Sequence, residues 1–110
     1  MISKLKVGGY VYSVAQVREL LPSDDDLIND THPTGEIEYT HYSIRIAGDV
    51  CEQHRESALL HEAIHAIEEQ FRTGLTEAQV SALEHGLYQV LVDNPKFTQM
   101  FIDRYRKLKE

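Results

Sequence analysis

The sequence predicts an α+β fold in one domain that spans residues 1–110. Short segments of alternating polar and apolar residues occupy the first half of the chain, as in β-strands. Longer segments with helical periodicity occupy the second half, and strands followed by helices are typical of α+β proteins. A chain of 110 residues suits a single core. We therefore expect a small, twisted, antiparallel-rich sheet packed on a buried helix, with two further helices completing the core.

Two segments are expected to supply the strands. The stretch "KLKVGGYVYSV" (4–14) alternates around Gly8-Gly9 and predicts a β-hairpin with a tight turn. The stretch "EIEYTHYSIRIA" (36–47) predicts one or two strands, because the pairs Ile37 and Tyr39, and Ile44 and Ile46, each have a period of two. Between them, "AQVRELL" (15–21) favours a short helical turn, and the acidic run Asp24–Asp26 indicates an exposed loop.

Three helices are expected after Asp49, which is a good N-cap residue. The first runs from about residue 50 to 72 and stops at Gly74. Thr76 and Gln79 form a capping box for the second helix, whose apolar face carries Val80, Leu83, Leu87, Val90 and Leu91. Asn94-Pro95 begins the third helix, which is expected to direct toward the core Phe97, Phe101, Ile102, Tyr105 and Leu108.

Composition limits the classes of partner. The net charge of −7 argues against nucleic acid or an anionic membrane as the main partner, because both attract basic surfaces. The single cysteine, Cys51, excludes an intramolecular disulfide. The N-terminus has no apolar signal-like region, and no apolar run reaches the length of a membrane span. We expect a cytoplasmic protein.

The first predicted helix contains the motif His61-Glu62-Ala63-Ile64-His65. Positions i and i+4 share a helix face, so His61 and His65 can bind one metal ion through their imidazoles. Glu62 lies about a hundred degrees around the helix, within reach of a water molecule on that metal. This H-E-x-x-H spacing is typical of zinc peptidases in which the glutamate is the general base. The competing interpretation is a helix with surface histidines, but the apolar residues around the motif argue against it.

Catalytic zinc usually has three protein ligands and one open position. The next helix offers two carboxylates, Glu77 and Glu84, seven residues apart on nearly the same face. Helix geometry alone slightly favours Glu84, which would lie nearer the height of His65 in an antiparallel hairpin. Glu77 lies in the first helical turn, where a carboxylate is favourable in any case.

The stretch "LLHEAIHAI…LTEAQVSALEHGLYQVLVDNP" resembles the ImmA/IrrE-like metallopeptidases, in particular the short stand-alone forms of phages and Gram-positive bacteria. The resemblance is strongest over residues 35–97. It implies a zincin-like fold with a third ligand that opens the helix after the motif. Apolar residues follow that ligand at three and six positions, a pattern that falls on Glu77, Val80 and Leu83. The resemblance therefore assigns zinc to His61, His65 and Glu77.

The expected function is zinc-dependent hydrolysis of peptide bonds in a protein or peptide substrate, with Glu62 activating water. The substrate is expected to lie extended beside residues 44–47. Candidate donors to the reaction's oxyanion are Tyr39, Tyr42 and Tyr88, although packing is the simpler role for each. Glu68 and Glu69 could orient the histidines, or form a solvated helix end. The other histidines are expected at the surface: His32, His41, His54 and His85. The alternatives are a metal-stabilised protein-binding module without activity and a metal-free helical interaction protein.

Overall fold

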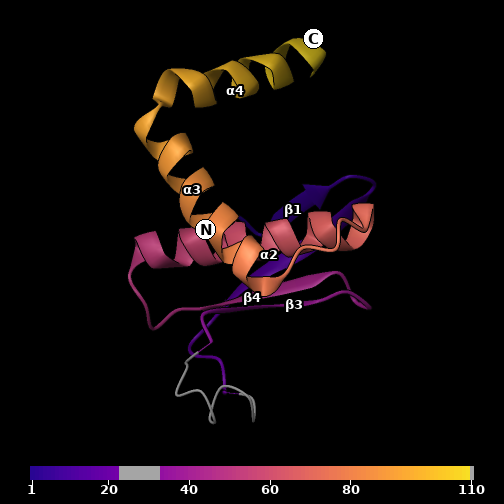
Figure 1. Cartoon of the computed structure of the whole chain (residues 1–110), viewed down its shortest axis with the longest axis vertical. Coiled ribbons are helices and arrows are strands. Elements are labelled where there is room, and N and C mark those ends of the chain that lie inside the picture. The colour runs from indigo at the N-terminus through magenta and orange to yellow at the C-terminus, as the bar shows by residue number, and fades with distance from the viewer. Residues whose placement is uncertain (23–32, 110) are drawn as a thin grey trace.

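The computed structural model describes residues 1–22 and 33–109 and has the predicted α+β architecture (Figure 1). Its sheet contains β1 (Lys4–Val7), β2 (Tyr10–Val17), β3 (Gly35–Glu38) and β4 (Ser43–Ala47). Its helices are α2 (Glu52–Phe71), α3 (Glu77–Asp93) and α4 (Pro95–Lys109). The acidic run Asp24–Asp26 and His32 lie outside the described residues.

The sheet is mixed, with the strand order β1-β2-β4-β3. The predicted hairpin at Gly8-Gly9 is confirmed, and β3 and β4 form a second antiparallel pair. The two central strands, β2 and β4, pair in parallel, which the sequence did not indicate. The helical turn predicted for residues 15–21 is wrong, because residues 15–17 continue β2 and pair with residues 45–47 of β4. This pairing makes β4 an interior strand and leaves β3 at the edge.

The core lies between the sheet and α2. Its buried members are Val7, Tyr12, Val14, Ile44, Ile46, Ala58 and Ala66. The two alanines belong to α2, and their small side chains let the helix approach the strands closely. The other side of α2 contacts α3, so α2 lies between the sheet and α3 (Figure 1). The expectation of a helix buried on most sides is wrong, because Ile67 and Phe71 of α2 are exposed.

The helix ends follow local sequence signals in two of three cases. The capping box of α3 is present, since the Thr76 side chain accepts from the Gln79 amide and the Gln79 side chain accepts from the Thr76 amide. Helix α4 begins at Pro95, as predicted. Helix α2 begins at Glu52 with Cys51 as its N-cap, two residues later than the Asp49 cap that was expected.

Helix α4 does not complete the core. Among the described elements it contacts α3 alone, and Figure 1 shows it extending away from the sheet. It has no buried residue, so the predicted packing of its five large apolar side chains is wrong. The physical reason is the linker: Asn94 alone separates α3 from α4, whereas helices that fold back on each other need about two to five linking residues. None of the described helices is both long and apolar enough to cross a membrane.

Candidate metal centre

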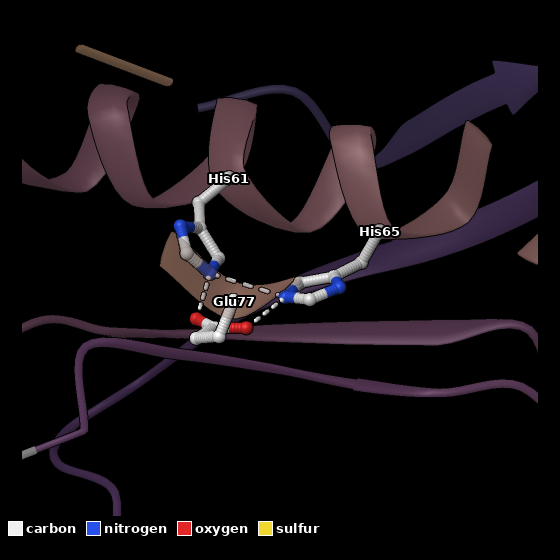
Figure 2. A group of neighbouring side chains, drawn as sticks. All are labelled: His61, His65 and Glu77. Atoms are coloured by element: carbon white, nitrogen blue, oxygen red, sulfur yellow. Dashed lines mark hydrogen bonds and ion pairs between the residues drawn. The ribbon is translucent and has the colours of Figure 1, made fainter. Parts of the chain in front are cut away.

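Three side chains from two helices converge on one point (Figure 2). The i, i+4 spacing places His61 and His65 on the same face of α2, and Glu77 reaches between them from α3 (Figure 2). The Nε2 atom of His61 lies 2.7 Å from one Glu77 oxygen, and the Nε2 atom of His65 lies 2.9 Å from the other. The two Nε2 atoms are 3.2 Å apart. The sequence motif therefore folds into a compact group with two nitrogens and a carboxylate.

The turn between α2 and α3 places Glu77. Helix α2 ends at Phe71, and its C-cap Arg72 has a left-handed backbone (φ 52°) and donates its amide to the carbonyl of Glu68 at 2.7 Å. Gly74 also has positive φ (72°), a conformation that glycine adopts without steric cost. The capping box then starts α3 at Glu77. Because Arg72–Thr76 is the whole linker, the first turn of α3 faces the histidines.

Glu84 occupies a different position from the one that helix geometry favoured. Its Oε1 lies 2.7 Å from Nδ1 of His61, on the opposite side of the imidazole from Glu77. Ser57 donates its hydroxyl to the other Glu84 oxygen. This places Glu84 behind the histidine, where a carboxylate fixes the ring orientation and the tautomer.

The imidazole of His65 also has a carboxylate behind it, at a longer distance than that between Glu84 and His61. Its Nδ1 lies 3.5 Å from Glu68 Oε2, within ion-pair distance. Each imidazole thus turns Nε2 toward the shared point and Nδ1 toward a carboxylate. Histidines that bind metals usually show this arrangement, because the outer carboxylate raises the basicity of the ligand nitrogen.

Glu62 is buried beside the centre, with 6% of its surface exposed. Burial raises the pKa of its carboxyl group, and nearby His61 and His65 only partly oppose this shift. Gly35 of β3 packs directly against it: a β-carbon built on Gly35 would lie 3.2 Å from Cγ and 3.3 Å from Oε1 of Glu62. The glycine therefore lets the edge strand approach the carboxylate closely.

The charge of His61 is set by opposing effects. Burial lowers the pKa of the imidazole, but the hydrogen bond to Glu84 and the charges of Glu77 and Glu62 together outweigh it, so the pKa is raised. A cation at this position is therefore favoured, whether it is a proton on His61 or a metal ion between the three side chains.

The three residues stand at the wall of a cavity of about 540 Å³. One side of the cavity is formed by Gly35 and Glu36 of the edge strand β3 and by Thr34, which precedes the strand. This corrects the expected substrate position beside residues 44–47, because β4 is paired on both sides within the sheet. The free strand edge next to the centre belongs to β3.

None of the three candidate tyrosines lines this cavity. The Tyr39 hydroxyl donates to the carbonyl of His65 at 3.4 Å, and burial followed by nearby Glu68 raises its pKa to about 12. Tyr88 donates to Glu56 at 2.9 Å, and Tyr42 stacks on Tyr10. Their positions agree with packing and surface roles.

Two histidines that were assigned to the surface do line the cavity. His54 precedes His61 by seven residues, so it lies on the same face of α2, and His85 follows Glu84 on α3. Both are exposed, as expected, but both stand at the cavity mouth. The seven-residue spacing was a readable signal for His54; no comparable signal marked His85.

The donor set fits zinc. Tetrahedral ligands at about 2.0–2.1 Å from zinc are roughly 3.3 Å from one another. The separations of 2.7, 2.9 and 3.2 Å between the donors are slightly smaller, so a bound ion would need only a small widening. A tetrahedral ion held by these two imidazoles and one carboxylate oxygen would keep one further position for a ligand. No family model, curated protein or solved structure matches the chain in comparisons with known proteins.

Proposed function

We propose that this protein is a zinc-dependent metallopeptidase of the ImmA/IrrE-like, zincin type. The observation that carries the proposal is the division of the two α3 carboxylates. Glu77 joins His61 and His65 at the shared point, while Glu84 holds His61 from behind. Among the described residues, the centre therefore has three candidate metal ligands rather than four, and three is the number typical of catalytic zinc sites. A purely structural site would fill all four positions, so this count favours an enzyme over a metal-stabilised binding module.

In this proposal each residue has a defined task. His61, His65 and Glu77 hold the zinc ion, which supplies a Lewis acid that polarises the peptide carbonyl and acidifies water. Glu62 takes a proton from the attacking water and passes it to the leaving amine. The raised pKa of Glu62 suits this task, because a carboxylate that accepts and returns a proton works best when its pKa approaches the working pH.

The edge strand β3 offers a place for the substrate. Its backbone lies beside Glu62 and is paired with β4 on one side only. An extended peptide can add to such an edge through main-chain hydrogen bonds. This places a scissile bond near the metal centre and shifts the expected substrate position from β4 to β3.

The test compares the zinc-loaded protein with its Glu62→Gln variant on a peptide mixture derived from a proteome. Cleavage products are identified by mass spectrometry, and zinc content is measured in both proteins. We expect the wild type to cleave a subset of peptides and the variant to be about 10²- to 10⁴-fold slower with its zinc retained. A Glu62→Gln variant with full metal and full activity would remove the general-base role.

A further inference from the structure

Helices α3 and α4 carry a series of large apolar side chains that the described residues leave exposed. We call this series the arm face, and its exposed members are Leu83, Leu87, Val90, Phe97, Met100, Phe101, Tyr105 and Leu108. Leu83, Leu87 and Val90 form a ridge on α3, since they are spaced by four and three residues. The α4 members recur with the same helical spacing. Apolar surfaces of this extent on otherwise soluble chains usually mark an interaction site.

No described part of the chain covers the arm face. Asn94 alone links the two helices, and α4 contacts α3 alone among the described elements. Side chains at the far end of α4 are correspondingly open to solvent, with Phe101 58% and Leu108 74% exposed. An isolated helix of 15 residues is marginal in water, so α4 needs a partner to stay helical.

Charge points to the identity of the partner. Helix α4 carries five Lys or Arg residues against one Asp, a net charge of +4. Residues 1–22 and 33–94 carry six Lys or Arg against twelve Asp or Glu, a net charge of −6. A basic, apolar helix attached to an acidic body is complementary to the body of a second copy of the same chain.

The area of the arm face also agrees with that of a stable protein interface. From the exposed fractions of its eight side chains, the arm face presents roughly 900 Å² per chain, against about 800 Å² per partner in a standard stable interface. We propose that the protein is a symmetric homodimer in which the α3–α4 arm of each copy packs on the acidic body of the other copy. None of the arm-face residues lines the cavity of the proposed metal centre, so substitutions in the arm face leave the metal ligands unchanged.

The test is the oligomeric state of the full chain, measured by sedimentation velocity over about a hundredfold range of concentration. We expect a species of twice the 12.6 kDa chain mass, which dissociates on dilution and more readily at high salt. The helical signal in circular dichroism should fall as the dimer dissociates, because α4 loses its partner.

Two matched variants locate the interface. Phe101→Asp introduces a charge at an exposed apolar position and should raise the dimer dissociation constant about a hundredfold. Gln99→Asp introduces the same charge at a polar position of α4, where it removes a hydrogen bond to Asp103, and it should change the constant far less than Phe101→Asp does. Because both positions are exposed, neither change should unfold the monomer.

Three results would overturn the proposal. The first is a monomer at every concentration, and the second is a dimer that resists Phe101→Asp. The third is a monomer that binds vesicles of anionic phospholipid through α4, which would assign the arm face to a membrane surface. Zinc binding and peptide cleavage are read separately, so failure of the dimer leaves the proposed function intact.

Discussion

At the scale of single residues, Glu62 and Glu84 are buried carboxylates in contrasting surroundings. Glu84 is hydrogen-bonded to the Ser57 hydroxyl and to Nδ1 of His61. Glu62 faces Gly35 and the cavity, and burial raises its pKa. The first arrangement suits a group that orients a neighbour. The second suits a group that exchanges protons.

Substituting Glu84 and Glu77 one at a time distinguishes a carboxylate that orients His61 from a carboxylate that binds the metal directly. We expect Glu84→Gln to weaken zinc binding by about 10- to 100-fold, because the amide no longer fixes and polarises His61. Glu77→Gln should weaken it more, since it replaces a direct ligand. Competition with a fluorescent chelator measures both constants, and Glu52→Gln, an exposed carboxylate of α2, is the matched control. Equal losses from the two variants would contradict the assigned roles.

The metal-free protein should become less stable as pH rises. The folded-state pKa of Glu62 lies above its ordinary 4.5 and that of His61 above its ordinary 6.5. As the pH rises past the ordinary pKa of each group, the unfolded chain loses that proton while the folded chain still holds it. The folded chain therefore binds more protons than the unfolded chain in this range. The contribution of each group to stability is complete below the ordinary pKa of that group. It is lost as the pH rises through the raised pKa of the folded state.

Zinc should reverse this trend, because it replaces the protons at the centre. We expect the melting temperature of the metal-free protein to fall between about pH 5 and pH 8, while the increase caused by zinc grows over the same interval. Thermal denaturation with and without a chelator measures both. If zinc raised the melting temperature by the same amount at every pH, the proposed coupling between His61, Glu62 and the metal would be contradicted.

At the scale of elements, local signals were sufficient where a helix or hairpin is determined by its own residues. The capping box at Thr76, the start at Pro95 and the turn at Gly8-Gly9 are of this kind. The parallel pairing of β2 with β4 depends on contacts distant in sequence, and no local pattern encodes it. The separate positions of Glu77 and Glu84 likewise depend on how α3 packs against α2.

The close approach of β3 to α2 is an element-scale feature that can be tested at Gly35. We expect Gly35→Ala to lower peptidase activity by about tenfold with zinc content unchanged, because the new methyl group displaces Glu62 by a few tenths of an ångström. Gly9→Ala is the control, since nothing lies within 4 Å of a β-carbon there. Activity and zinc content are measured in both. Unchanged activity in Gly35→Ala would show that Glu62 tolerates the shift.

At the scale of the whole molecule, α3 connects the metal centre to the arm. Its first turn carries Glu77, and its middle buries Val80 and Glu84 against α2. Its last turns leave Val90 exposed and lead through Asn94 into α4. The sequence predicted the existence of α4 from its own periodicity. The separation of α4 from the core follows from the one-residue linker, because this linker limits where α4 can lie relative to α3 and the sheet.

His61, His65 and Glu77 are proposed to form a zinc site with one open position. The most direct measurement is zinc stoichiometry by elemental mass spectrometry on untagged protein, together with zinc-edge X-ray absorption. We predict one zinc per chain with two imidazole nitrogens and oxygen ligands at about 2.0–2.2 Å, including one oxygen from solvent. A stable protein that takes up no zinc would contradict the account, and so would zinc bound by four protein ligands.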